Sequence, residues 1–362
     1  MKPLTFDRAF PKSLLDATEE HLMDVWRGDV RRVYSCAAAA PGCRWLDDPI
    51  RQAETAAAGI MRESGYPGYN IPRLAADFGE TSVAAYWGGR VSQSDGGGTA
   101  IEPVVHNVGE ADALRPPDPA NGGDAALAAK LYRDVCGILM TEPYDRLWTT
   151  TIDLRSPLDT AAMLWEPSDF MGAMSEHPAV VHRFLDRVTD HLIAVVEASL
   201  ASAKGRVCGG IQPEIWLPSD LGIVITDERM AMVSGDVYKE FGIPYLERIS
   251  RRFGGLFIRC RGAFGRQLAS LRDSGVNLLG LEYSHPYTRL ADIFRVFEDS
   301  IVIAPRMGAK ASEEYEGKAA FLGDMARRAP REARLWFTLR SEDPDFMAQL
   351  AIAQAHITSY RL

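Results

Sequence analysis

Apolar and polar residues follow two different rhythms in this chain, and the change comes near residue 145. Before it the pattern is irregular, although 13–26 carries apolar residues near one face and predicts a helix. The Ala-rich stretch 48–64 predicts a second helix. Residues 92–100 enclose a run of three glycines between apolar stretches, which predicts a β-hairpin with a loose turn.

After residue 145, short apolar runs alternate with amphipathic segments. Strands are predicted at 147–154, 207–216, 256–260, 276–282, 301–306 and 335–340. Helices are predicted from His177 to Gly205 and over 236–253, and a further helix with Asp343 as its N-cap follows the last strand. The strands are apolar along their whole length, as expected of a parallel sheet that is buried on both faces.

Repeated strand–helix units are typical of a (β/α)8 barrel or of a doubly wound sheet. A dinucleotide-binding sheet needs a glycine-rich turn between an early strand and its helix, and this chain has no such turn. We therefore predict an α/β protein with a single (β/α)8 TIM barrel over 65–362. An N-terminal helical extension over 1–64 precedes the barrel, and the β-hairpin is an excursion from it.

Composition sets broad limits on function. Of 362 residues, 46% are hydrophobic and 25% charged, which is ordinary for a globular protein. The net charge of -9 argues against binding to nucleic acid or to an anionic membrane. There is no apolar run of about 18 residues that would predict a transmembrane helix, and the first residues lack the apolar core of a signal peptide. Five scattered cysteines then indicate reduced thiols, so we expect a cytoplasmic protein.

The predicted carboxyl ends of the last four strands carry most of the candidate chemistry, because catalytic residues of such barrels lie at these ends. They offer Arg259, Cys260 and Arg261, then Glu282, Tyr283 and His285, then Arg306, and finally Arg340. A guanidinium stays charged and matches a carboxylate or phosphate with two parallel hydrogen bonds. The arginines therefore predict a pocket for an anionic substrate. The alternative is that each pairs with Glu282, Glu342 or Asp343 in a structural network.

Some residues at these ends could bind substrate or move protons. Glu282 and His285 lie three residues apart just past a strand, and either could act as a general acid or base if burial tunes its pKa. Gln212 and Glu214, at the end of an earlier strand, could face the same mouth. Tyr283 is a further candidate for substrate binding.

Five segments, in chain order, carry a family resemblance. They are 152–160 (IDLRSPLDT), 174–185 (MSEHPAVVHRFL), 218–222 (PSDLG), 238–248 (YKEFGIPYLER) and 254–262 (GGLFIRCRG). Together they resemble the uroporphyrinogen decarboxylase superfamily over roughly 65–360, which implies a single (β/α)8 barrel. The resemblance also implies that Asp220 faces the pocket, where it could act as an acid. An Asx-turn or a helix cap is the alternative role for this residue.

Two departures from the family pattern narrow the chemistry. The decarboxylases carry a loop of the type R-x-P-x-W-x-M-R-Q-A-G-R, which has no counterpart here, so a porphyrinogen substrate is not implied. The methyltransferases bind zinc through His-x-Cys, where this chain has Arg259, Cys260 and Arg261, and through a later Cys, where it has 337–339 (FTL). One thiol between two cations is a poor ligand set for a dication, so we predict no metal. Cys260 would have a lowered pKa if exposed, and would be a small core residue if buried.

These observations predict an enzyme that removes a carboxylate from an anionic small molecule without metal or bound cofactor. Asp220, Glu282 or His285 would protonate the resulting carbon, while arginines hold the substrate. A second hypothesis, from the resemblance, is methyl transfer to or from a corrinoid carried by a partner protein. A third is a catalytically inactive barrel that serves as a binding protein. The oligomeric state is left open, with a homodimer as one candidate.

Overall fold

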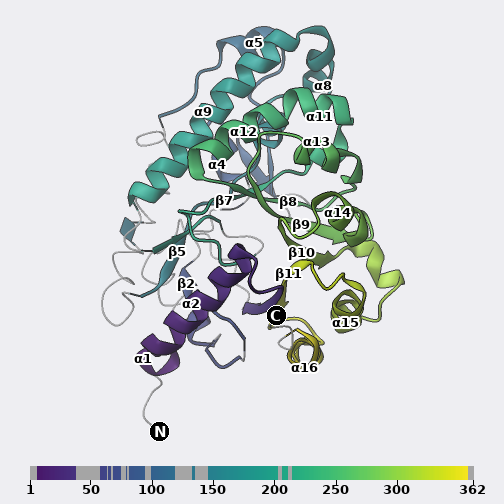
Figure 1. Ribbon diagram of the computed structural model, residues 1–362. Coiled ribbons are helices and arrows are strands. Elements are labelled where there is room, and N and C mark those ends of the chain that lie inside the picture. The colour runs from purple at the N-terminus through teal and green to yellow at the C-terminus, as the bar shows by residue number, and fades with distance from the viewer. Residues whose placement is uncertain are drawn as a thin grey trace.

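The computed structural model of this protein describes residues 6–37, 58–62, 64–66, 68–74, 79, 81–93, 99–118, 133–134, 146–202, 206–210 and 214–357. Its parallel strands are surrounded by helices (Figure 1). The larger sheet has six strands in the order β1 (Arg32–Ala37), β11 (Arg334–Arg340), β10 (Val302–Met307), β9 (Leu278–His285), β8 (Leu256–Cys260) and β7 (Ile223–Thr226). The smaller has three, in the order β2 (Arg73–Leu74), β5 (Trp148–Thr150) and β6 (Arg206–Cys208).

Hydrogen bonds connect these two sheets on both sides. The Val224 N–H donates to the Gly209 carbonyl at 2.7 Å where β6 meets β7. The Tyr69 N–H donates to the Tyr34 carbonyl at 3.4 Å, just ahead of β2. The predicted α/β class with a parallel sheet is confirmed. Closure into a barrel of eight strands does not follow from strand pairing alone and stays a prediction.

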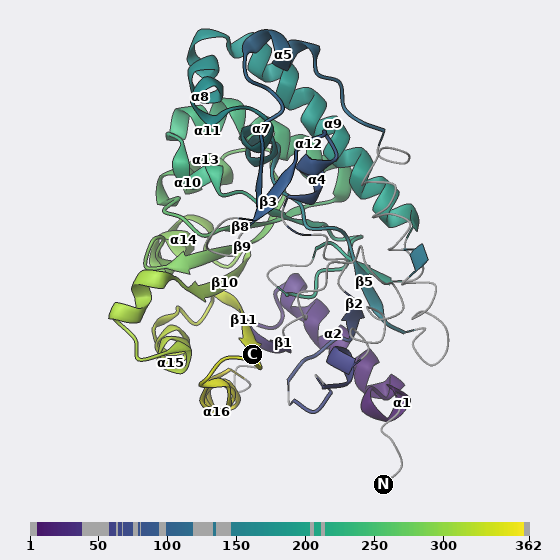
Figure 2. The same cartoon turned by 180° about the vertical axis from the view of Figure 1, so that it is seen from behind.

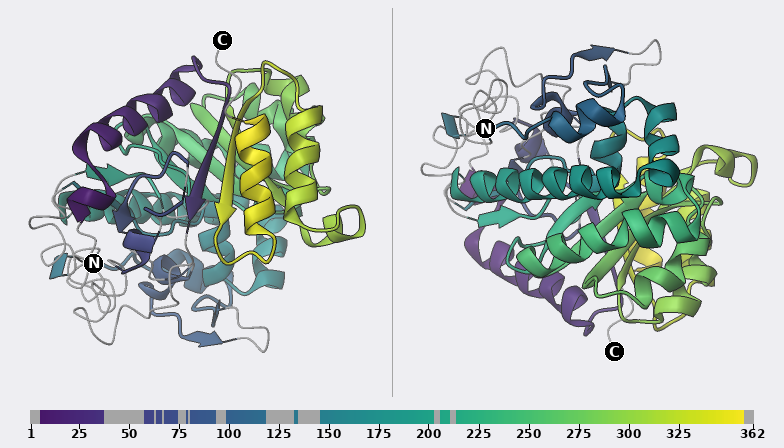
Figure 3. Two further views of the ribbon diagram at one scale, coloured as in Figure 1. Left: turned by 90° about the horizontal axis from the view of Figure 1, so that it is seen from below. Right: turned by 90° about the horizontal axis from the view of Figure 1, so that it is seen from above.

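Four strand–helix units follow one another after residue 255, as the sequence predicts. Strands β8 to β11 are succeeded by α13 (Leu268–Arg272), α14 (Leu290–Phe297), α15 (Lys318–Arg328) and α16 (Phe346–His356), with short 3-10 turns at Gly265–Gln267 and Ala309–Glu313. These helices lie on the outer side of the strands (Figure 3). Helix α16 begins after Asp345, two residues later than the predicted N-cap at Asp343.

Alternate residues of these strands face two different cores, because successive side chains of a strand point to opposite sides. Ile258, Leu281 and Ile303 belong to the cluster between strands and helices. Phe257 and Trp336 belong to the cluster enclosed by the strands. The residue type therefore does not reveal the face, since both faces are apolar.

The remaining helices pack around the rest of the chain. They are α1 (Phe6–Ala9), α2 (Lys12–Arg27), α4 (Ser82–Ala85), α5 (Val108–Ala113), α7 (Pro157–Leu164), α8 (Pro167–Glu176), α9 (Pro178–Ser202), α10 (Arg229–Met232), α11 (Gly235–Phe241) and α12 (Ile243–Phe253). Helices α2 and α9 confirm two predictions, whereas the single helix predicted over 236–253 is divided at Gly242. No described helix is both long enough and apolar enough to cross a membrane.

The hairpin predicted at 92–100 is present. Strands β3 (Val91–Gln93) and β4 (Thr99–Ile101) pair in antiparallel fashion away from the parallel sheets (Figure 2). The residues that join them, like most of the helix predicted over 48–64, lie outside the described part of the chain.

Three strands were missing from the sequence prediction: the two-residue β2, and β1 and β7, which matter more for the site. Strand β1 lies inside 1–64, which was interpreted as purely helical, yet it pairs with β11 from Arg32 to Ala37 at one edge of the larger sheet. Strand β7 comes directly after the PSDLG segment, and β6 is what the described residues show of the strand expected over 207–216. Strand β1 is short and depends on long-range pairing with β11, which local pattern does not report. Strand β7 is a short β-branched run whose local signal was overlooked. The domain boundary at residue 64 stays a prediction.

Candidate active site

Three charged side chains meet inside the larger sheet. Arg259 on β8 and Glu282 on β9 are register partners, so their side chains leave the sheet on the same face. The Arg259 Nε–H donates to Glu282 Oε1 at 2.9 Å, and Arg306 Nη1 on β10 lies 3.8 Å from the same oxygen. Arg259 and Glu282 are buried, whereas the Arg306 side chain is 38% exposed. One carboxylate thus orients two guanidiniums, of which only Arg306 reaches solvent.

A second ion pair stands at the same mouth. Arg340, at the end of β11, donates from Nη2 to Glu214 Oε1 at 2.5 Å, and its Nη1 lies 4.0 Å from Glu342. Glu214 follows β6 and has a positive φ of 60°. Arg259, Arg306 and Arg340 therefore pair with carboxylates, which was one alternative from the sequence. Arg306 and Arg340 also lie around one cavity.

These residues surround a cavity of about 140 Å³ between described parts of the chain. Its inner wall is formed by Glu214, Glu282, Ala304, Arg306, Trp336, Thr338 and Arg340. Arg259 behind Glu282 adds a third guanidinium, and Glu342 beside Arg340 adds a third carboxylate, so the charges balance. The partly exposed guanidiniums of Arg306 and Arg340 can still offer an anion direct charge-assisted hydrogen bonds.

Burial and neighbouring charge act in opposite directions on these groups. Burial raises the pKa of Glu282, while the guanidiniums of Arg259 and Arg306 oppose the rise. Burial lowers the pKa of Arg306. For Arg340, burial acts to lower the pKa, but the Glu214 carboxylate outweighs it and the pKa is raised. Glu282 is consequently easier to protonate than an ordinary glutamate.

Two residues predicted at this mouth face the other way. Tyr283 and His285 alternate with Glu282 along β9, so their side chains point toward the helices. The Tyr283 hydroxyl donates to the Met325 sulfur at 3.6 Å, and burial raises its pKa. His285 Nε2 lies 3.1 Å from Glu314 Oε2. Both predicted roles at the mouth are wrong because the strand places adjacent residues on opposite faces.

Asp220 lies at the opposite end of the strands. It belongs to the turn that precedes β7, is exposed, and is near Gly254, which precedes β8. The prediction that it faces the pocket is wrong because the sequence reading placed this loop after a strand, whereas it comes before the unrecognised strand β7.

A further candidate, Arg261, is not among the residues that line the cavity. The Arg261 Nε–H donates to Glu228 Oε1 at 2.5 Å, and the Arg261 backbone N–H donates to the same carboxylate. Gln212 lies outside the residues that the structure describes.

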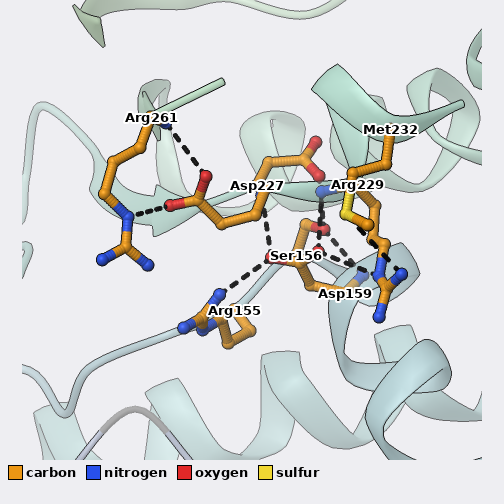
Figure 4. Close-up of polar contacts among 8 residues, drawn as sticks. Arg155, Ser156, Asp159, Asp227, Arg229, Met232 and Arg261 are labelled. Carbon is orange, nitrogen blue, oxygen red and sulfur yellow. Dashed lines mark hydrogen bonds and ion pairs between the residues drawn. The ribbon is translucent and has the colours of Figure 1, made fainter. Parts of the chain in front are cut away.

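The sequence analysis missed a buried carboxyl pair next to α7 (Figure 4). Asp227, just after β7, accepts hydrogen bonds from the hydroxyls of Ser156 at 2.9 Å and Tyr238 at 2.8 Å. Asp159 accepts from the backbone N–H groups of Glu228 and Arg229. Burial and the neighbouring Asp159 carboxylate raise the pKa of Asp227 to about 7. The S-P-x-D sequence at 156–159 was a visible N-cap signal, but its contact with β7 was not.

The zinc-binding arrangement of the family's methyltransferases does not fit the residues found here. Cys260 alternates with Arg259 and packs in the cluster between strands and helices. It is fully buried, and burial raises its thiol pKa, which disfavours the thiolate that zinc requires. Among the described residues, no group of three or more His, Cys, Asp and Glu side chains could hold a metal ion.

Comparison with known proteins supports the resemblance seen in the sequence. The family profile described as uroporphyrinogen decarboxylase matches residues 76–208. Over these residues the chain is similar to the uroporphyrinogen decarboxylase family, in agreement with the resemblance seen in the sequence. No curated protein sequence matches it.

A solved structure shares the fold of this chain. It is a methyltransferase from Methanosarcina mazei, with a TM-score of 0.66 and 13% sequence identity over 94% of this chain and 98% of that chain. The profile match ends at residue 208, before β8, so it does not include the cavity arginines or Glu282. The description of the site therefore rests on this chain's own sequence and structure.

Proposed function

We propose that this protein is an enzyme that removes a carboxylate group from a small anionic substrate bound by Arg306 and Arg340. The observation that carries the proposal is the convergence of these two partly exposed guanidiniums with the buried Glu282 on one cavity. A guanidinium can hold a carboxylate with charge-assisted hydrogen bonds of about 1.5–3 kcal/mol each.

Glu282 is the proton donor in this proposal. Of the three acids named from the sequence, it alone lines the cavity. When the bond to the departing carboxylate breaks, CO2 leaves and the electron pair stays on the substrate carbon. Glu282 then gives its proton to that carbon and is reprotonated from water. A carboxyl whose pKa burial has raised is suited to donate near neutral pH.

The proposed scaffold for this chemistry is a closed TIM-barrel-like arrangement of both parallel sheets, whose six and three strands make one strand more than the eight predicted. The hydrogen bonds at both junctions between the sheets support closure, as does the extensive structural likeness to the methyltransferase. In such barrels the carboxyl ends of the strands form the active site.

Methyl transfer is the second candidate, favoured by that same structural neighbour. The arginines would again hold an anionic substrate, and the methyl group would pass to or from a corrinoid on a partner protein. The two reactions differ in product, since one releases CO2 and the other changes the methylation of the partner's corrinoid.

Binding and turnover together test the proposal. Calorimetric titration with small carboxylates should show binding that weakens at least tenfold in Arg306→Met and in Arg340→Met. Arg295→Met is the matched control, because this arginine is exposed on α14 and pairs only with Asp292 among the contacts described. Release of 13C-labelled CO2 from a panel of labelled acids should require both cavity arginines.

Three outcomes contradict the decarboxylase proposal. Carboxylates that bind equally to wild type and Arg306→Met would remove its basis. Turnover that requires a methylated corrinoid protein would establish methyl transfer instead. Binding without any turnover would favour the inactive, ligand-binding barrel.

A further inference from the structure

Strands β10 and β11 are paired over only two residues and then separate. Val302 pairs with Arg334 and Ile303 with Leu335. Beyond these pairs, β10 remains paired with β9 over its full length, and β11 remains paired with β1. Pro305 has no N–H group to donate to a neighbouring strand. The wall of the larger sheet therefore opens between the carboxyl halves of β10 and β11.

The cavity at the arginines passes through this opening. Besides Arg306 and Arg340 on the inner face, its lining includes Met307 and Phe337, which alternate with inward-facing residues and point outward. It also includes Leu322 of α15, which lies outside these strands (Figure 1). The cavity thus connects the charged interior with the layer under α15.

The two ends of the passage differ in chemistry from its middle. The inner end presents the guanidiniums, and the middle is walled by apolar side chains such as Phe321 and Leu322. At the outer end Lys318 pairs with Asp343, and the Lys318 side chain is 47% exposed, so the passage meets solvent there. An apolar cavity of about 150 Å³ takes up benzene. This cavity measures about 140 Å³ with its charged ends included, so its apolar middle holds a group smaller than benzene.

We propose that the substrate is an amphipathic carboxylate whose apolar body, smaller than benzene, occupies the opening between β10 and β11. Leu322 sets the length of that body, and Lys318 with Asp343 marks where it ends. The inference rests on the proposed function, because the arginines must hold the carboxylate for the body to enter the opening.

Chain length is the variable that tests this assignment. Calorimetric titration of unbranched carboxylates from acetate to octanoate should show affinity rising about fourfold per methylene, the equivalent of about 0.8 kcal/mol. The rise should stop near the length that fills the cavity. In Leu322→Trp the longer acids should lose at least tenfold in affinity while acetate is unchanged. Leu322→Ala should shift the plateau to longer acids, and it keeps the test valid if the tryptophan variant fails to fold.

Ala320→Trp is the matched control, since Ala320 is an exposed position on the same helix. It should reproduce the wild-type series. An affinity that is independent of chain length in wild type, with acetate binding still dependent on Arg306, would overturn this inference and leave the proposed function standing. If no acid binds, acetate included, the proposed function itself fails.

Discussion

At the scale of single residues, Glu282 has two duties that a substitution can separate. Its carboxylate holds Arg259 and Arg306, and its proton is the one proposed to reach the substrate carbon. Glu282→Gln keeps the shape but removes the acid. We expect kcat to fall by about 10²–10⁴-fold with little change in KM, since general acid catalysis is worth that much. Steady-state kinetics of CO2 release measures both constants.

The opposite split would assign Glu282 a different role. If Glu282→Gln raises KM and leaves kcat intact, the carboxylate only orients the guanidiniums that bind substrate.

Arg259 and Glu282 form a buried ion pair, so removing one partner should cost more than removing both. In Arg259→Met, Glu282 loses its closest cation while it stays buried. We expect the free energy of unfolding in urea to drop by about 3–5 kcal/mol. The double variant Arg259→Met with Glu282→Leu should recover most of this loss. Equal loss in both variants would mean that packing at Arg259, not charge, is what stabilises the site.

The sequence supplied the arginines and Glu282 but not the faces on which their neighbours lie. In a strand buried on both sides, Glu282 and Tyr283 are both compatible with either face, because no polar–apolar alternation marks the inner one. The register with β8 places Arg259 and Glu282 on the same face, and the cavity lining shows that this face is the inner one. The sequence does not contain this information, which is why His285 and Tyr283 were assigned to the mouth together with Glu282.

At the scale of elements, the carboxyl pair at Asp159 and Asp227 joins β7 to three helices. Ser156 and Asp159 come from the start of α7, Tyr238 from α11, and the N–H group of Arg229 from α10. The pair is buried, so it is most stable when one of its carboxyls keeps a proton.

This pair should make stability depend on pH in a defined window. The folded protein holds a proton on Asp227 up to about pH 7, whereas the unfolded chain releases it near pH 4. The folded state therefore binds more protons in this window, and the contribution of Asp227 to the free energy of unfolding falls as pH rises from about 4 to 7. Asp227→Asn should lose less stability than wild type over this range in urea titrations.

Asp220→Asn serves as the control for that comparison, because Asp220 is exposed before the same strand. Its stability should follow the wild-type curve. If the free energies of unfolding of Asp227→Asn and wild type changed with pH in parallel, Asp227 would be ionised over the whole range.

The failure to predict strand β7 explains why Asp220 was placed at the wrong end of the sheet. Strands β8 to β11 are apolar runs followed by helices and could be predicted from pattern. Strand β7 is a short run of four β-branched residues between Gly222 and Asp227, a local strand signal that the sequence analysis did not use. Once β7 is recognised, Asp220 must lie at the amino end of the sheet, far from Glu282 along the strand direction.

At the scale of the whole molecule, the amino-terminal segment is part of the core. Leu22 and Val25 of α2 belong to the cluster enclosed by the strands. The ring of Trp26 lies 5.7 Å from that of Trp336 and 6.3 Å from that of Phe257. Figure 3 shows α2 beside β1 on the lower side of the strands. Helix α2 therefore covers one end of the interior, and the site lies at the other.

Two leucines of α2 test whether this segment is structurally integral. Leu22 is fully buried against the inner cluster, whereas Leu14 is exposed on the same helix. We expect Leu22→Ala to lower the free energy of unfolding of the whole chain by about 2–5 kcal/mol, and Leu14→Ala to change it by less than about 0.5 kcal/mol. Urea unfolding followed by circular dichroism and by tryptophan fluorescence should show one shifted transition. If Leu22→Ala instead produced a separate early transition with the main one unchanged, residues 1–64 would be an independent extension, as the sequence alone suggested.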